Sequence, residues 1–390
     1  MMCDGIKRML QAEKMSDGAR IRRAVYEVTP DSKWIQTEFG YYSLEAWHNQ
    51  GKIEGGHDPW EYDEYLKKQF FLEEEGQFYL NGANWEAAEF YPRFEDKVLE
   101  DRGDKEVIQD EYGRTVLVYK RSRTGYMPEY LGHPVRDIET WKTACEWRMD
   151  PSDKERYKAL DKRIPLAIAG AKRGDMMVQR FCGGFMYLRS LMGPENLLYL
   201  VYDDPELIHV CMKKWLELAD AVAAYHQQFV TLDELFFGED ITYNMGPLIS
   251  PHMIREFLFP YYRKLIENVR SRQQDPDRTL YLHLDTDGKI ESVIPLYQEL
   301  GFQVFSPFEV ASGSDVREIG KKYPNIVITG GIDKRMFSKS KEEMHAYLDQ
   351  VLPVMKKRGG YIPTCDHGVP EEADFDNYVS YRRRCYEMQN

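Results

Sequence analysis

The chain has 390 residues, of which 43% are hydrophobic and 13% aromatic, and this composition excludes a disordered protein. Its 52 basic residues against 65 acidic ones give a formal net charge of −13, which disfavours nucleic acid and anionic lipid as partners. No uncharged apolar run is long enough to span a bilayer, and the first residues lack the apolar stretch of a secretion signal. We therefore expect a cytoplasmic protein whose six scattered cysteines are reduced thiols.

Residues 1–150 differ in pattern from residues 151–390. The first part is crowded with aromatic and charged residues, and we interpret it as an N-terminal extension and insertion that belongs to the same domain as the rest. Residues 34–39 (WIQTEF) are predicted to form a strand. Residues 98–121 alternate apolar and polar side chains on both sides of a DEYGR turn, which predicts a β-hairpin with Gly113 at the turn.

After about residue 160, short apolar runs alternate with longer amphipathic segments. The predicted strands cover residues 176–181, 232–238, 279–284, 302–307, 325–331 and 361–364. This alternation predicts parallel strands joined by right-handed helical crossovers. Together with the strand at 34–39 it favours an α/β fold of the (β/α)8 TIM-barrel type. A doubly wound open sheet is the alternative, but no Gly-rich dinucleotide fingerprint or P-loop follows any of these strands.

In such a barrel, residues with chemistry lie at the carboxyl ends of strands. The strongest local pattern is His283-Leu-Asp285-Thr-Asp287-Gly288, because alternate side chains of an extended chain point the same way. An imidazole and two carboxylates suit zinc or another divalent ion. The alternative is structural: Asp287 caps the next helix and His283 packs inside the barrel. An EF-hand is excluded because Lys289 stands where an oxygen ligand is needed.

Other strand ends also carry reactive groups. Cys365 and His367 follow the last strand, so a thiol and imidazole pair is conceivable, but residues so close in sequence usually point apart. We favour His367 as a metal ligand or proton donor at the barrel mouth. Asp240 either caps a helix or binds substrate, and we favour binding because it ends a strand. Gly330 and Gly331 either approach a ligand or form a tight turn, and we favour the turn.

Residues 238–271 (GEDITYNMGPLISPHMIREFLFPYYRKLIENVRS) resemble the uroporphyrinogen decarboxylase superfamily. The segments DTDGKI, GFQVFSPFEVASGSDV, ITGGIDK and GGYIPTCDHGVP follow in the order that the superfamily has. The resemblance covers roughly residues 160–390 and implies a (β/α)8 barrel. It also implies one of two chemistries.

The decarboxylase arm of the superfamily carries an RxxGRY motif that grips the carboxylates of a porphyrinogen. The matching stretch here, WIQTEFGYYSLEAW, has no arginine, although His367 resembles a histidine of those enzymes. The cobalamin-linked methyltransferase arm holds zinc with an H-x-C motif, a later Cys and sometimes a Glu. Two registers are open: His283-Leu-Asp285 with Cys365, or Asp285-Thr-Asp287-Gly288 with His367. Glu309 resembles the family's glutamate in either register.

We therefore predict a metal-assisted methyltransferase that moves a methyl group between a small methylated, possibly methoxy, substrate and a corrinoid carried by a partner protein. The predicted ligands of a zinc or other divalent ion are Asp285, Asp287, Glu309 and His367, and the predicted catalytic residues are Asp240, His283 and Cys365. The alternative is a carboxy-lyase acting on a porphyrinogen-like substrate, with Asp240 and His367 handling protons and no metal. A catalytically silent binding protein is a third possibility, which the acidic strand ends argue against.

Overall fold

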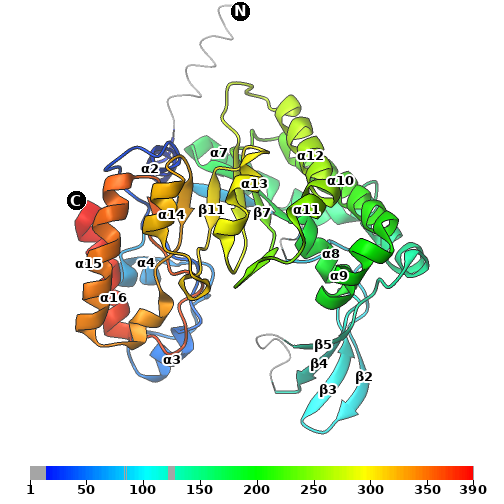
Figure 1. Cartoon of the computed structure of the whole chain (residues 1–390), viewed down its shortest axis with the longest axis horizontal. Coiled ribbons are helices and arrows are strands. Elements are labelled where there is room, and N and C mark those ends of the chain that lie inside the picture. The colour runs from blue at the N-terminus through cyan, green and yellow to red at the C-terminus, as the bar shows by residue number, and fades with distance from the viewer. Residues whose placement is uncertain (1–14, 83, 85, 122–127, 390) are drawn as a thin grey trace, which may run out of the picture.

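The computed structural model describes residues 15–82, 84, 86–121 and 128–389, and its centre is a seven-stranded parallel sheet (Figure 1). The strands are β1 (Gln77–Leu80), β6 (Met176–Cys182), β7 (Glu234–Gly238), β10 (Tyr281–Asp285), β11 (Val304–Ser306), β12 (Val327–Thr329) and β13 (Tyr361–Ile362). They lie side by side in chain order, and every neighbouring pair is parallel. The predicted strands β6, β7, β10, β11, β12 and β13 are confirmed, whereas β1 was not predicted.

Helices connect these strands, as repeated βα units require. They are α7 (Ile164–Arg173), α8 (Gly184–Met192), α9 (Pro194–Asp203), α10 (Pro205–Gln227), α11 (Pro251–Phe257), α12 (Phe259–Arg272), α13 (Ile294–Gln298), α14 (Val316–Lys322), α15 (Lys341–Arg358) and α16 (Phe375–Gln389). The amphipathic segments predicted after each strand are therefore helical. Because every crossover makes the next strand run in the same direction, the carboxyl ends of all the strands lie at one end of the sheet. The polar residues that follow the strands therefore meet there.

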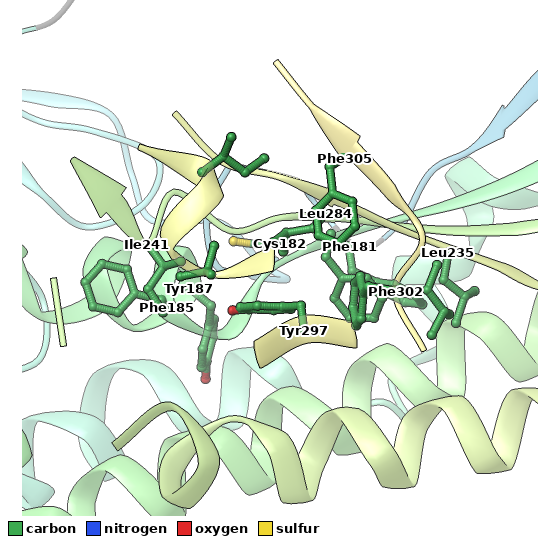
Figure 2. Packing of buried hydrophobic residues seen from close by; sticks show 14 of the residues in the cluster. Phe181, Cys182, Phe185, Tyr187, Leu235, Ile241, Leu284, Tyr297, Phe302 and Phe305 are labelled. Atoms are coloured by element: carbon green, nitrogen blue, oxygen red, sulfur yellow. The ribbon is translucent and has the colours of Figure 1, made fainter. Parts of the chain in front are cut away.

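The two faces of the sheet are packed differently because successive strand residues point to opposite sides. Outward side chains such as Phe181, Leu235, Leu284 and Phe305 belong to the main hydrophobic core, part of which Figure 2 shows together with Tyr297 of α13. Burying each such side chain contributes about 1.5–3 kcal/mol.

The inner face is apolar only at the amino ends of the strands. A separate apolar cluster there contains Ala19, Val25, Tyr26, Ile35, Met176, Tyr281, Val304, Val327 and Ile362. The first three belong to α2 (Asp17–Tyr26), which covers this end of the sheet. Farther along the strands the inner face becomes polar, and a candidate site can form only at the carboxyl end.

The predicted strand at residues 34–39 does not form. Residues 34–38 are buried, and two of their hydrogen bonds reach residues next to the two edge strands. Before β1, Glu73 N donates to Gln36 O at 2.8 Å, and after β13, Cys365 N donates to Glu38 Oε1 at 2.7 Å. The segment thus lies between the two edge strands, β1 and β13. On the β13 side it is joined through the side-chain carboxylate of Glu38 and not through a ladder of backbone hydrogen bonds.

The predicted hairpin is confirmed within a four-stranded antiparallel sheet that projects from the body of the molecule in Figure 1. Its strands are β2 (Lys97–Arg102), β3 (Lys105–Gln109), β4 (Thr115–Tyr119) and β5 (Glu129–Gly132). Gly113 has φ +75° at the β3–β4 turn, and its N–H donates to Asp110 O at 2.9 Å. This backbone conformation suits glycine because it lies in the left-handed region.

Short elements complete the fold. They include α3 (Leu44–Asn49), α4 (Glu64–Phe70), α5 (Ile138–Thr140), α6 (Lys158–Asp161), a π-helix over Trp141–Cys145 and the β8–β9 pair (Thr242–Tyr243 and Gly246–Pro247). Within the described ranges, no helix is both long enough and apolar enough to cross a membrane.

Candidate active site

The last residue of β10 and the loops after β7, β10, β11 and β13 bring together five predicted residues, called here the mouth cluster: Asp240, Asp285, Asp287, Glu309 and His367. Asp287 N lies 3.5 Å from Asp240 Oδ1, and Asp287 Oδ2 lies 3.9 Å from His367 Nε2. The charges of Asp240, Asp285 and Glu309 all act on Asp287. Parallel strands explain this meeting, because their carboxyl ends share one edge of the sheet.

Glu309 is fixed by the loop that follows Asp287. Its Oε2 accepts the N–H of Gly288 at 2.8 Å, and its Oε1 lies 3.7 Å from Lys334 Nζ. Gly288 has φ +79°, and a Cβ added there would lie 2.6 Å from Tyr243 Cα. The glycine of the DTDG motif is therefore required by the backbone, because only glycine tolerates both this φ and this close approach.

Asp240 is a strained residue with a firm ionic partner. Its φ of +48° places a non-glycine residue in the left-handed region, a conformation that costs of order 1–3 kcal/mol. Arg189 Nη2 lies 2.6 Å from Asp240 Oδ2, and the other carboxylate oxygen faces Asp287 N. Asp240 therefore orients the loop of Asp287 and is already neutralised by an arginine.

His283 lies inside the sheet in a chain of hydrogen bonds that ends at Asp285. Its Nδ1 lies 2.8 Å from Glu234 Oε1, and its Nε2 lies 2.8 Å from Ser306 Oγ. Ser306 in turn donates to Asp285 Oδ2, and Glu234 also accepts a bond from Tyr26 OH at 2.8 Å. Both ring nitrogens of His283 are occupied, so this imidazole positions Asp285 through Ser306.

The electrostatics of the cluster favour protonated carboxyl groups. Burial raises the pKa of Asp285 to about 6, against the hydrogen bond that Ser306 donates. Burial and the carboxylates of Asp240, Asp285 and Glu309 hold the pKa of Asp287 well above its usual range. Like charges that share a confined site oppose each other's ionisation. Asp285 and Asp287 are thus candidates for groups that give and take protons near neutral pH.

His367 is held between two aromatic rings, those of Phe39 at 5.1 Å and Tyr42 at 5.9 Å between ring centroids. Its Nδ1 accepts the N–H of Gly368 at 2.8 Å, which places the proton of the neutral ring on Nε2. Burial lowers the pKa of His367, so the ring is neutral at pH 7. The Nε2–H group faces Asp287, and His367 can donate a hydrogen bond there.

Cys365 does not join the cluster as a nucleophile. Its side chain is fully buried, and burial together with the Glu38 carboxylate raises the pKa of the thiol well above its ordinary value. Its backbone N–H is bonded to Glu38, and its backbone pairs with Ile332. A buried thiol that stays protonated cannot attack a substrate.

The predicted metal ligands do not fit zinc as they are arranged. Across the described part of the chain, no three His, Cys, Asp or Glu side chains converge closely enough to hold a metal ion. His367 would have to present an unprotonated Nε2 to a metal, but the bond from Gly368 to Nδ1 puts the ring proton on Nε2. No step proposed below uses a metal.

Comparison with known protein families shows to which family the chain belongs. The model of the family described as uroporphyrinogen decarboxylase (URO-D) matches residues 126–385. The chain belongs to the uroporphyrinogen decarboxylase family. This confirms the resemblance noted in the sequence, and the family implies a TIM barrel.

Individual relatives of this URO-D family member are distant. The uroporphyrinogen decarboxylase of Gloeobacter violaceus is 24% identical over 188 residues, and the match spans 46% of this chain and 48% of that protein, about half of its length. Among solved structures, a methyltransferase from Methanosarcina mazei has a TM-score of 0.46 at 13% identity, covering 67% of this chain and 73% of that one. A putative vitamin-B12 independent methionine synthase from Listeria monocytogenes has a TM-score of 0.31 at 12% identity, covering 58% and 68%.

Sequence reasoning missed several residues that this URO-D site uses. Ser306 links Asp285 to His283, and Phe39 packs on the ring of His367. Arg180 lies on β6, and its charge opposes the raised pKa of Asp285. An arginine inside the apolar run MMVQRF was the one available signal, because a charge in a buried strand needs a partner or a function. The contact between Phe39 and His367 had no such signal, since more than 300 residues separate them.

Proposed function

We propose that this URO-D family member is a carboxy-lyase that removes CO2 from a small carboxylate-bearing molecule and protonates the carbon left behind. The observation that carries the proposal is the pair Asp285 and Asp287 at the end of β10. The pKa of Asp285 is raised to about 6, and the pKa of Asp287 is held far enough above its usual range for this carboxyl group to keep its proton near neutral pH. A protonated carboxyl group at a strand end is suited to act as a general acid. We further propose that residues 34–38 complete a (β/α)8 barrel around this site.

In the proposed step, the bond between the substrate carbon and its carboxylate breaks, CO2 leaves, and the electron pair stays on carbon. Asp287 gives its proton to that carbon and becomes a carboxylate. Its side chain is 43% exposed, so solvent can return the proton directly. His367 Nε2–H donates a hydrogen bond to a substrate oxygen beside Asp287.

The chain from Asp285 to Glu234 has a separate role. When Asp285 is protonated, it can donate to Ser306, whose hydroxyl then donates to His283 Nε2. When Asp285 is ionised, Ser306 donates to it instead. The hydroxyl of Ser306 can therefore turn to suit either protonation state of Asp285.

The substrate we propose carries fewer carboxylates than a porphyrinogen. Several carboxylates require several cations, and the segment around Tyr41 supplies none. Tyr41 is instead buried, with its hydroxyl 2.8 Å from that of Tyr378 on α16. The predicted zinc ion, methyl transfer, corrinoid-carrying partner and cytoplasmic location stay predictions.

The test is release of labelled CO2 from a monopyrrole that bears an acetate and a propionate side chain, with uroporphyrinogen in a parallel assay. We expect turnover of the monopyrrole, deuterium at the decarboxylated carbon in D2O, and a rate lower by about 10²-fold or more in Asp287→Asn. Asp333→Asn is the matched control, because that strand-end carboxylate is paired with Arg335 outside the cluster.

Three results would contradict the proposal. Turnover of uroporphyrinogen at an ordinary enzymatic rate would refute the proposal that the substrate is small, but it would leave decarboxylation as the reaction. Full activity of Asp287→Asn would remove that residue as the proton donor. Methyl transfer that requires a bound metal, without release of CO2, would restore the methyltransferase prediction.

A further inference from the structure

Arg180 is a cation on the inner face of the sheet that is held in place without an ionic partner. It is the half-buried residue of β6, whose six other residues are buried. Its guanidinium carbon lies 3.8 Å from the centroid of the Tyr79 ring and 5.6 Å from that of Phe236. Its Nε is buried and makes no hydrogen bond, and no carboxylate of the described chain forms an ion pair with it.

Arg23, whose Nε also makes no hydrogen bond, is paired with Asp233 through another guanidinium nitrogen, and the buried arginines Arg382 and Arg22 have polar partners too. Arg382 bonds to Gln36 Oε1 and Pro363 O, and Arg22 bonds to Glu75 O. Burying a charged donor without a partner is unfavourable, and arginine cannot escape the cost by losing its proton. The partner of Arg180 is therefore expected to come from outside the chain.

The aromatic rings that contact Arg180 leave the edge of its guanidinium as the part that can bind a ligand. Cation–π contact with Tyr79 supports the guanidinium on its face. The edge of a guanidinium carries paired N–H donors that match the two oxygens of a carboxylate. A carboxylate is thus the ligand group that this geometry favours.

The sheet register places Arg180 below the mouth cluster. Arg180 is aligned with Phe236, and Phe236 with His283. Cys182 and Asp285 are both aligned with Gly238, one layer nearer the mouth. Two residues of strand correspond to about 7 Å between Cα atoms, so a ligand held by Arg180 lies one layer below the mouth cluster and can extend toward it.

We propose that Arg180 anchors a carboxylate of the substrate that is not lost, and that the substrate is a small dicarboxylate whose reacting carbon lies on the mouth side of this anchor, next to Asp287. The position of the reacting carbon rests on the proposed function, whereas carboxylate binding by Arg180 does not.

Binding is tested with phenylacetate and its neutral amide, phenylacetamide, by calorimetric titration of the full chain near pH 7.5. We expect saturable binding of phenylacetate to the wild type and an affinity lower by about tenfold or more in Arg180→Met, since a charge-assisted pair is lost. Arg180→Lys keeps the charge without the paired donors and should lie between the two. Phenylacetamide should bind weakly to every variant.

Arg189→Gln is the matched control, because Arg189 is the cation of the same mouth that already has Asp240 as its partner. The proposal is overturned if Arg180→Lys and Arg180→Met bind phenylacetate like the wild type, if Arg189→Gln alone loses binding, or if the wild type shows no saturable binding. Melting curves identify a variant that fails to fold, and Arg180→Lys then decides. Anchoring without any CO2 release would keep this inference and refute the proposed function.

Discussion

Buried carboxylates at the two ends of the parallel sheet have different partners: arginines at the amino end and a serine hydroxyl at the carboxyl end. At the amino end, Asp233 accepts bonds from Arg23, from Arg278 Nη1 at 2.9 Å and from Met177 N at 2.7 Å. Burial raises the pKa of Asp233, and both arginines oppose that effect. At the carboxyl end, Asp285 has Ser306 as its hydrogen-bond donor and other carboxylates nearby.

This contrast separates a structural end of the sheet from a chemical one. Two arginines pair with Asp233 and stabilise its ionised form. One of them, Arg23, lies on α2, so this ion pair holds α2 against the sheet. At the mouth, Asp240 is paired with Arg189 and Glu309 lies near Lys334, but Asp285 and Asp287 have no arginine or lysine in ion-pair contact within the described chain. Ionising these two groups therefore opposes folding, since their charge is removed from water without compensation. Such a cost is typical of groups that must exchange protons during a reaction.

The amino end gives the largest expected change in stability. Asp233→Ala removes the shared acceptor and leaves two arginines and a backbone N–H without it. We expect a loss of about 3–5 kcal/mol in the free energy of unfolding, measured by urea denaturation. Glu217→Ala, which removes a half-exposed partner of Lys214 on α10, should have a far smaller effect. Equal losses in both variants would refute the contrast.

At the carboxyl end, Asp285→Asn should stabilise the protein at high pH. The folded pKa of about 6 exceeds the unfolded value of about 3.9, so the folded chain binds more protons between these limits and wild-type stability falls as pH rises through them. Asparagine cannot ionise, so the variant does not lose stability in this way as pH rises. We therefore expect a gain of up to about 3 kcal/mol at pH 8 that disappears below about pH 4, measured by urea denaturation at several pH values.

Asp315→Asn is the control for that prediction, with the opposite sign. Arg317 lowers the pKa of Asp315, so its contribution is present above the unfolded pKa and is lost as pH falls. The variant should therefore be less stable than the wild type at pH 8. A gain from Asp285→Asn that is the same at every pH would show that charge is not its cause.

The smallest expected change in stability belongs to His367→Gln. The ring contacts Phe39 and Tyr42 at a half-buried position, so the unfolding free energy should change by no more than about 0.5 kcal/mol. Turnover should nevertheless fall by about 10²-fold, because the Nε2–H donor is displaced. Melting temperature and CO2 release measure the two effects. A variant that unfolds, or that keeps full turnover, would assign His367 a structural role.

Local sequence pattern was enough for the main architecture. Alternation within strands and helical periodicity between them predicted β6, β7 and β10 to β13 with their helices, because these signals depend on neighbours in the chain. Parallel strands then placed Asp240, Asp285, Asp287, Glu309 and His367 at one edge. The short strand β1 was missed. Residues 34–39 were predicted as a strand because an apolar run in the sequence looks the same whether or not its backbone pairs with a neighbouring strand.

What each strand-end residue does was decided only by tertiary contacts. The sequence by itself determined that the chain would place carboxylates, an imidazole and a thiol at one edge of a parallel sheet. It did not determine that Glu234 and Ser306 occupy both nitrogens of His283, that Cys365 is buried, or that Arg180 lacks a partner. Those outcomes depend on side chains from strands far apart in the chain, and charge and protonation follow from such neighbours.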